Sequence, residues 1–428
     1  MSNKTDSKVG RREFIGTAAA ASAMIIKPEL VWGTEKNSAV RLGLLGCGGR
    51  GTGVTASFIE HTGAVVTGLG DIFESQAIRA KETLDKVSAK FDKPAIDLSG
   101  IFTGPKAYEQ LFNSKDVDAI YIATPPYFHP DQLEAAIAAG KHTYLEKPVG
   151  VDVPGCKKVM KLGAKADGKM SLAVGFQIRH ASAYVEMVKR IHNGQMGKPV
   201  TGLINYFASA LKRPDTPGAS PDERRLRNWV WDRVLSGDII VEQNIHVIDV
   251  TNWVLDGHPV SATGAGGRAG RLDDGDAFSH FNAVYTYPND VHISFASTQF
   301  GKSAWGVKMQ YSGSHGVAEA NYGSPVRIDG ENPWDAPGIG EPEEVSQEDA
   351  VTGRFAGALD DADPNKQKNF IESITSGQFL NETKTGAESA LTAILAREAA
   401  YTGEEVTWDK LMKSDKVYDP KMDFSKLG

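Results

Sequence analysis

The chain has 428 residues, of which 41% are hydrophobic and 24% charged, a composition that is typical of a globular protein with room for about two domains. A net charge of −7 argues against the clustered basic surface that binds nucleic acid. Two cysteines, Cys47 and Cys156, are too few for a disulfide framework, and no Cys/His cluster has metal-ligand spacing, so we expect no metal and no required disulfide.

The amino terminus contains twin arginines, Arg11 and Arg12, followed by the weakly apolar run GTAAAASAMII. This pattern is typical of a twin-arginine export signal, so we expect a leader at residues 1–37 and a periplasmic or otherwise exported protein. The alternative is an Ala-rich terminus that contains two arginines by chance. The run of about 12 apolar residues is shorter than the roughly 20 that span a bilayer, so no membrane insertion after export is expected.

A βαβ pattern follows the leader. Residues 40–46 form a short apolar run, a helical pattern extends to about residue 61, and residues 64–70 form a second buried run ending at Asp71. The alternation continues with predicted strands at 117–124, 142–148 and 171–177 and predicted helices at 132–139 and 153–166. Strands that alternate with helices predict a doubly wound parallel sheet, and we assign a Rossmann domain to residues 38–160.

The pattern changes after residue 200. The predicted strands there alternate apolar and polar residues or are rich in β-branched and aromatic residues, at 201–208, 277–287, 291–298 and 307–313, with a helix predicted over 239–255. We therefore predict a second α/β domain at residues 161–428, built on an open, predominantly antiparallel sheet. We also expect the helices near the carboxyl terminus to pack back on the first domain.

The sequence LLGCGGRGTG contains a dinucleotide-binding fingerprint. Gly46, Gly48 and Gly51 form GxGxxG between a strand and a helix, where backbone amides can meet a pyrophosphate. Asp71 follows Gly51 by 20 residues, where a carboxylate can bind the ribose hydroxyls of NAD and repel a 2′-phosphate. We predict NAD. NADP stays open because Arg50 could reach a 2′-phosphate.

Chemistry-bearing residues also follow two later strands. Lys147, in Glu146-Lys147-Pro148, lies where a cation can stabilise alkoxide character on a carbinol oxygen during hydride loss. The alternative is a structural ion pair at a strand end. Thr124 and Pro125 end the preceding strand and would border the nicotinamide, and His129 after them is more typical of a helix start or loop than of a catalyst.

The segment VEQNIHVIDV places three ionisable groups on one helical stripe. Glu242, His246 and Asp249 are spaced i, i+4 and i+7, and Ile245 and Ile248 face elsewhere. Imidazole is the side chain that titrates near neutrality without a large shift, so His246 is the expected general acid or base, with Glu242 or Asp249 supporting its tautomer. The alternative is a solvated stripe or a core histidine.

Together these motifs resemble the Gfo/Idh/MocA oxidoreductase family. The resemblance rests on LGLLGCGGRG, ATPP, AGKHTYLEKPVG, GFQIRH, EQNIHVIDVTNWVLDG and AYTGEEVTW, in this order between about residues 38 and 412. It implies a Rossmann domain joined to an α/β domain whose sheet face makes an oligomer interface, here a homodimer or homotetramer. It implies NAD- or NADP-dependent chemistry on a sugar or polyol hydroxyl, with Lys147 and His246 as catalytic residues. The chain departs from the family at Glu242, where many members have aspartate.

The predicted site consists of catalytic, cofactor-binding and substrate-binding residues. The catalytic residues are Lys147, His246 and Glu242; the cofactor-binding residues are Gly46, Gly48, Gly49, Arg50, Gly51, Asp71, Thr124, Pro125, His129, Glu146, Lys147 and Gln177; the substrate-binding residues are Lys147, Arg179, Trp231, Glu242, His246 and Asp249. Aromatic faces and forked arginine donors suit carbohydrate, although a packed loop with surface arginines would have the same composition.

Export constrains the mechanism, because a periplasm offers no dependable pool of free NAD. A cofactor loaded before export would have to be held tightly and regenerated within the enzyme's own cycle. One alternative is a redox-assisted glycosidase that works through a transient 3-keto sugar, although the variant known among such relatives lacks the lysine of EKP. A second alternative is a non-catalytic carbohydrate-binding protein.

Overall fold

We describe the protein from a computed structural model, in which residues 39–271, 273–301, 306–339 and 357–427 are described. The predicted export signal lies outside these residues. From Val40 onward the chain forms one compact unit. Among the described residues, no helix is both long enough and apolar enough to cross a membrane.

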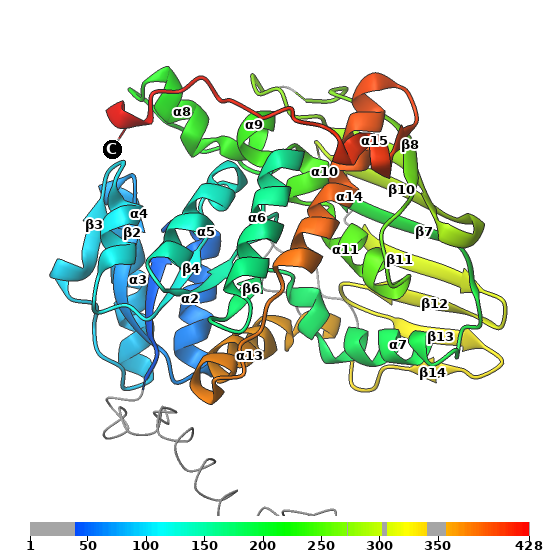
Figure 1. Cartoon of the computed structure of the whole chain (residues 1–428), viewed down its shortest axis with the longest axis horizontal. Helices are drawn as coiled ribbons and strands as arrows, with labels where there is room; N and C mark the ends of the chain where they lie inside the picture. The colour runs from blue at the N-terminus through cyan, green and yellow to red at the C-terminus, as the bar shows by residue number, and fades with distance from the viewer. Residues whose placement is uncertain (1–38, 272, 302–305, 340–356, 428) are drawn as a thin grey trace, which may run out of the picture. The chain divides into compact units, whose positions relative to one another are not determined.

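The first half of this unit is built on sheet A, a parallel sheet whose described strands have the order β3-β2-β1-β4-β5-β6 (Figure 1). These strands are β1 (Arg41–Leu45), β2 (Val65–Asp71), β3 (Ile101–Thr103), β4 (Ala119–Ile122), β5 (His142–Leu145) and β6 (Leu172–Val174). The parallel sheet expected from the sequence is confirmed. Its last strand, β6, lies beyond the predicted boundary at residue 160.

Helices cover both faces of sheet A, which explains why β4 is buried along its whole length. The helices of the alternating pattern are α2 (Gly49–His61), α3 (Glu74–Lys90), α4 (Ala107–Asn113), α5 (His129–Ala138) and α6 (Val153–Ala166). Leu42 and Leu44 of β1 pack with Phe58 of α2 in one core cluster, whereas Leu45 faces the opposite core with Leu133 of α5. Because all these strands pair in parallel, their carboxyl ends lie at a common edge of the sheet.

The second half is built on sheet B, a mixed and mostly antiparallel sheet with the order β14-β13-β12-β11-β7-β10-β9-β8-β15 among the described residues. Its strands are β7 (Pro199–Ala208), β8 (Ser261–Gly267), β9 (His280–Tyr287), β10 (Val291–Gln299), β11 (Gly306–Gly313), β12 (Gly316–Asn321), β13 (Val326–Gly330), β14 (Trp334–Asp335) and β15 (Val406–Thr407). Only the β7–β10 pair is parallel among the pairs of described strands, so the expected predominantly antiparallel sheet is confirmed.

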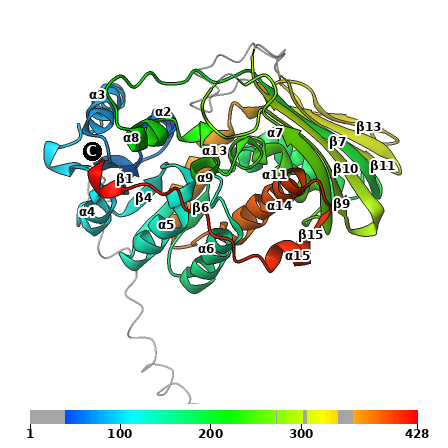
Figure 2. The same ribbon diagram turned by 90° about the horizontal axis from the view of Figure 1, so that it is seen from above.

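Three helices, α7 (Ser182–His192), α11 (Ile245–Val254) and α14 (Thr383–Thr402), lie against one face of sheet B (Figures 1 and 2). The alternating burial of β7 and β9 follows from this one-sided cover. Leu203 and Val284 point to the opposite face and are 53% and 38% exposed. The pairing of both residues with Ser294 of β10 places them in one row across the sheet.

The helix predicted over 239–255 is interrupted. It consists of α10 (Ile239–Glu242) and α11, which begins at Ile245. The backbone N–H of Asn244 donates to the carbonyl of Ile239, five residues back, at 2.9 Å, which is a wider turn than an α-helix makes. Glu242 therefore ends one helix and His246 lies in the first turn of the next, so the predicted continuous stripe is wrong.

The carboxy-terminal region joins the two halves of the unit. Helix α13 (Ala362–Ser376) contacts α2 beside sheet A, and α14 contacts α6, β8 and β9. After α15 (Trp408–Met412) the chain runs back to α8 (Pro221–Arg227) near the edge of sheet A, where the two views show it beside that helix (Figures 1 and 2). We call residues 413–427 the C-terminal segment.

Candidate functional site

The glycine loop between β1 and α2 has the backbone geometry that a dinucleotide requires. Gly46 has a φ of +93°, and a Cβ there would lie 2.7 Å from the backbone of Ala123. A Cβ on Gly51 would lie 2.0 Å from the carbonyl oxygen of Gly46, so α2 could not approach β1 as closely. Gly48 caps α2 without a side-chain hydrogen bond and has open space around it. The amides at the start of α2, including that of Gly49, are thus accessible to a phosphate.

Asp71 ends β2, as predicted. Its carboxylate accepts hydrogen bonds from the backbone N–H of Cys47 at 2.7 Å and of Phe73 at 2.8 Å. These two bonds fix the carboxylate beside the glycine loop. Burial raises the pKa of Asp71, and the hydrogen bonds from Phe73 and Cys47 oppose that shift.

A cavity of about 400 Å³ extends from this loop. Five of the predicted cofactor-binding residues line it: Gly46, Gly48, Asp71, Thr124 and Pro125. Its other end is apolar and includes residues that sequence reasoning missed, namely Phe73, Leu226, Trp229 and Phe424. These four residues come from three distant parts of the sequence, and no local motif marks them. An accessible helix start, a fixed carboxylate and an apolar end fit NAD.

Arg50 lies inside a buried ion network. Its guanidinium donates to Glu146 at 2.9 Å, to Asp363 of α13 at 3.0 Å and to Gln177 at 2.9 Å. Arg50 is thus committed to two carboxylates, which removes the reason for leaving NADP open on its account. Glu146 and Gln177 likewise belong to this network and do not line the cavity. Sequence reasoning missed Asp363, which only the fold brings to the glycine loop.

His129 is fully buried between two strand-end loops. Its Nδ1 lies 2.6 Å from the carbonyl oxygen of Pro148, and its Nε2 lies 2.8 Å from that of Thr124. Burial lowers the pKa of His129, and the two backbone hydrogen bonds oppose that shift. With both ring nitrogens engaged, His129 connects the loop after β4 to the loop of Lys147. His129 therefore stabilises two loops of the predicted cofactor site without lining the cavity.

Lys147 and Glu242 meet across the two halves of the unit. The Nζ of Lys147 donates to the backbone carbonyl of Glu242 at 2.7 Å and lies 3.7 Å from Oε1 of the same residue. The break between α10 and α11 leaves this carbonyl turned toward the lysine. The other carboxylate oxygen of Glu242, Oε2, is buried without a partner among the described residues. Burial raises the pKa of Glu242, and Lys147 opposes that shift.

His246 is 8% exposed, and its ring lies edge-on to those of Phe176 and Tyr322. Its Nδ1 is buried without a hydrogen-bond partner among the described residues. Burial and then the nearby cations Lys147 and Arg50 hold the pKa of His246 well below its ordinary value of 6.5. The expectation that His246 titrates near neutrality without a large shift is therefore wrong. The imidazole is neutral at pH 7.

Asp249 does not face His246. Its carboxylate receives a forked pair of hydrogen bonds from Arg179, at 2.9 Å from both Nε and Nη2, and a third from Ser389 at 2.7 Å. Asp249 is 1% exposed. The predicted support of the His246 tautomer by Asp249 is not formed, because Arg179 and Ser389 occupy that carboxylate. Arg179, predicted to bind substrate, is anchored by the same pair.

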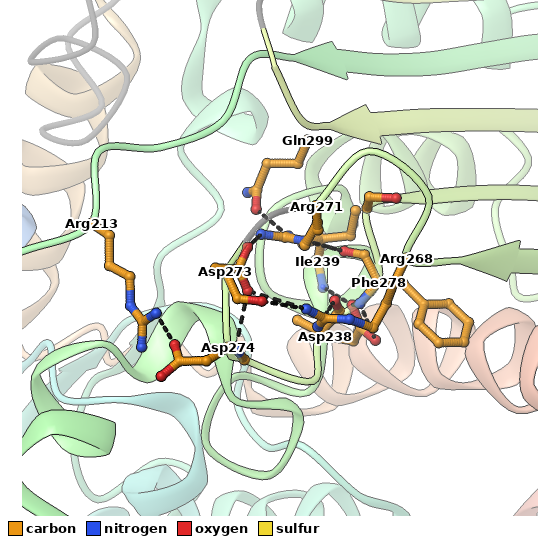
Figure 3. Close-up of polar contacts among 12 residues, drawn as sticks. Arg213, Asp238, Ile239, Arg268, Arg271, Asp273, Asp274, Phe278 and Gln299 are labelled. Atoms are coloured by element: carbon orange, nitrogen blue, oxygen red, sulfur yellow. Dashed lines mark hydrogen bonds and ion pairs between the residues drawn. The ribbon is translucent and has the colours of Figure 1, made fainter. Parts of the chain in front are cut away.

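Trp231 is placed by the loop between β8 and β9. Its backbone carbonyl accepts from the N–H groups of Asp276 and Ala277 at 3.0 and 3.2 Å, and its side chain is largely buried. Figure 3 shows Arg268 and Arg271 directed at Asp273, which braces this loop.

Asp238 ties the same loop to the start of α10 (Figure 3). Its carboxylate accepts hydrogen bonds from the backbone N–H groups of Ile239 and Phe278. It also accepts one from the hydroxyl of Tyr401, at 2.6 Å. Trp231 and the helix of Glu242 therefore share one support.

Comparison with known proteins adds to this geometry. A model described as an oxidoreductase family with an NAD-binding Rossmann fold matches residues 40–176, and the GFO/IDH/MocA C-terminal domain matches residues 184–319. The chain is 31% identical over 172 residues to the inositol 2-dehydrogenase of Salmonella paratyphi B (strain ATCC BAA-1250 / SPB7), covering 40% of this chain and 44% of that protein.

A 1,5-anhydro-D-fructose reductase from Ensifer adhaerens is 28% identical over 178 residues, 41% of this chain and 49% of that protein. The chain thus spans less than half the length of these two curated relatives. The crystal structure of scyllo-inositol dehydrogenase from Lactobacillus casei, with bound NAD(H) and scyllo-inositol, matches with a TM-score of 0.65 at 17% identity. That match covers 86% of this chain and 99% of that chain, and it shows a shared fold.

Proposed function

Since the chain belongs to the GFO/IDH/MocA family of oxidoreductases, we propose that it transfers a hydride between a tightly held NAD and a hydroxyl of a sugar or polyol. The proposed site combines the cavity at the glycine loop with the cluster of Lys147, Glu242 and His246. Both lie beyond the carboxyl ends of sheet A, where open α/β sheets bind ligands.

The observation that carries this proposal is a pair of buried polar atoms without partners. Oε2 of Glu242 and Nδ1 of His246 are both unpaired among the described residues, and both residues adjoin Lys147. An unsatisfied buried polar atom costs about 1–3 kcal/mol, so such atoms call for a ligand that pairs with them. A polyol offers hydroxyl groups that donate and accept at adjacent carbons. This supports a polyhydroxylated substrate.

In the oxidation direction each residue has a defined task. The neutral imidazole of His246 accepts the hydroxyl proton of the substrate, because its lowered pKa keeps a lone pair available at pH 7. Lys147 stabilises the developing alkoxide, and the backbone carbonyl of Glu242 holds its ammonium group in place. NAD, when bound, supplies the acceptor for the hydride that leaves the carbinol carbon. The products would be a carbonyl compound, NADH and the protonated imidazole.

Two features of the site favour NAD over NADP. The carboxylate of Asp71, fixed by backbone hydrogen bonds, would repel a 2′-phosphate and accept the ribose hydroxyls. The guanidinium of Arg50, which by its sequence position could have reached a 2′-phosphate, is instead paired with Glu146 and Asp363.

The test begins with the purified protein, which is denatured so that any released nucleotide can be identified by mass. The native protein is then offered a panel of sugars and cyclitols while the absorbance of bound NADH is followed. We expect NAD and a polyol-dependent absorbance change, and His246→Ala and Lys147→Met should each lower kcat/KM by roughly 10²–10⁴. Lys161→Met, on the exposed face of α6, is the matched control. Full turnover by both site variants would refute the proposed mechanism.

The same experiment separates the alternatives. Release of free sugar from a glycoside, without a net change in NADH absorbance, would identify the redox-assisted glycosidase. Sugar binding without turnover in the unmutated protein would identify the non-catalytic carbohydrate-binding protein.

We also propose export by the twin-arginine route, on the strength of Arg11-Arg12 and the apolar run that follows. A retained cofactor is consistent with this route, because the protein could be loaded before transport. Cell fractionation should find the protein outside the cytoplasm. Joint replacement of Arg11 and Arg12 by lysine should keep it inside, and an unchanged distribution would contradict the signal.

A further inference from the structure

A separate hydrophobic cluster closes the apolar end of the cofactor cavity. Its buried members are Phe73, Leu226, Leu235 and Leu427, and Ile72, Tyr127, Phe128, Trp229, Met422 and Phe424 pack against them. They come from the β2–α3 connection, the turn after β4, the region of α8 and the C-terminal segment. Six of them also line the cavity: Ile72, Phe73, Phe128, Leu226, Trp229 and Phe424. The cluster is thus both a packing contact and a wall of the binding site.

Hydrogen bonds between the backbone of the C-terminal segment and side chains of other elements hold the segment against this wall. The carbonyl of Pro420 accepts from Nη1 of Arg225 on α8 at 2.8 Å, and the N–H of Tyr418 donates to Asp152 at 2.8 Å. The N–H of Asp423 donates to Asp222, also on α8, at 3.2 Å. Figures 1 and 2 both show the segment beside α8. The segment is thus bonded both to α8 and to the N-terminal cap of α6.

Aromatic contacts fix Phe424 at the end of this path. Its ring lies 5.1 Å from that of Phe128, edge to face, and 6.5 Å from that of Tyr127. Two further lining residues also pair, since the guanidinium of Arg227 lies 3.6 Å from the centre of the Phe73 ring. The carboxylate of Asp71 accepts hydrogen bonds from the backbone of Cys47 in the glycine loop and of Phe73 in the cluster, so it connects the glycine loop to this aromatic end. If Gly48 faces the pyrophosphate and Asp71 the ribose, the aromatic end faces the base.

We propose that the C-terminal segment is part of the cofactor site, with Phe424 a wall of the adenine-binding end, and that it must move before the dinucleotide leaves. This inference rests on the proposed function and adds a physical basis for cofactor retention. Opening the site exposes the apolar cluster and breaks the bonds to Arg225, Asp152 and Asp222, so release is slow. An element about 370 residues after the glycine loop thereby controls the residence time of NAD.

The test measures dissociation of NADH from the purified full chain. Protein loaded with NADH is mixed with excess NAD⁺, and the loss of bound-nucleotide fluorescence gives the rate constant. Phe424→Ala should speed dissociation at least about tenfold, since it removes one wall of the base end. Arg225→Ala should shift the rate in the same direction, because it frees Pro420. Val417→Ala, in the same segment but 66% exposed, should leave the rate unchanged.

The NADH release rates of the two variants test the inference. If folded Phe424→Ala and Arg225→Ala both release NADH at the unmutated rate, the inference is overturned. Should Phe424→Ala fail to fold, the rate of Arg225→Ala decides alone. The readout is separate from catalysis: faster release from the variants of a protein that oxidises no polyol would support this role of the segment and contradict the proposed function. Unchanged release from an active dehydrogenase would do the opposite.

Discussion

Burial changes what individual side chains of the site can do. His246 lies against Phe176 and Tyr322 and near two cations, so its imidazole is held neutral, although its sequence position suggested a group that switches charge near pH 7. The two carboxylate oxygens of Glu242 lie in different surroundings, since one faces Lys147 and the other has no partner among the described residues. The sequence indicated which residues carry the chemistry, and the surroundings of those residues determine their protonation.

The pKa of His246 should depend on Lys147. Protonation of the imidazole is disfavoured by the nearby ammonium, so Lys147→Met should raise the pKa of His246 toward 6.5. NMR titration of labelled histidines measures this shift. Lys161→Met removes an exposed lysine of α6 and should leave the pKa of His246 unchanged. An unchanged or lower pKa of His246 in Lys147→Met would contradict a contribution of Lys147 to the shift.

Arg50 should contribute to stability as well as to the shape of the glycine loop. Arg50→Met leaves Glu146 and Asp363 without their shared cation in a site where all three side chains are at most 20% exposed. Stranding a buried charge costs about 3–5 kcal/mol, and urea unfolding at pH 7 measures the loss. The matched control is Arg41→Met, whose ion pair with Asp118 is more exposed and should cost at most about 1 kcal/mol. Equal losses would contradict this account.

At the scale of elements, the parts with a local signal could be predicted and the rest could not. The glycine loop, Asp71 at the end of β2 and the positions of β1, β2, β4 and β5 follow from short apolar runs and strictly spaced glycines. The break between α10 and α11 has no proline or glycine to mark it, because tertiary contacts create it. The same holds for Asp363 and Phe424, which reach the site from more than 300 residues beyond the glycine loop.

The start of α2 offers a test of the phosphate site. Gly48 has open space around its Cα, so Gly48→Ala should fold with unchanged melting temperature but weaken NAD binding, roughly tenfold or more, by placing a methyl group at the helix start. Gly63→Ala, just beyond the other end of α2 and equally open, should change neither quantity. Isothermal titration with NAD measures the affinity. Normal NAD affinity in Gly48→Ala would remove the pyrophosphate from this position.

At the scale of the whole molecule, we propose that the open face of sheet B makes a homo-oligomer interface. The apolar side chains Leu203 and Val284 lie in one row on that face, away from α7, α11 and α14. The sequence predicted the two sheets, a strand at 171–177 and helices near the carboxyl terminus that pack back on the first domain, but it did not indicate that α13 brings Asp363 to Arg50. Long-range packing, rather than any local pattern, decides that organisation.

Leu203→Lys should therefore lower the mass of the particle in solution. A buried lysine opposite its symmetry-related neighbour would disfavour association, and light scattering after size-exclusion chromatography measures the mass. Leu98→Lys alters a more exposed leucine, 71% exposed on a turn before β3, and should leave the mass unchanged. A monomeric unmutated protein, or an unaltered oligomer in Leu203→Lys, would contradict an interface at this face.

The path of α13 and α14 has a consequence for recombination between relatives. Helix α13 packs on α2 beside sheet A, and α14 bridges α6 and sheet B, although both follow sheet B in the chain. A chimera that exchanges everything after β6 would therefore import foreign partners for α2 and α6. A graft of residues 175–339 that leaves the recipient its own α13 and α14 preserves the contacts of α2 and α6, and it should succeed only where the contacts of α14 with β8 and β9 and of α8 with the C-terminal segment are matched as well.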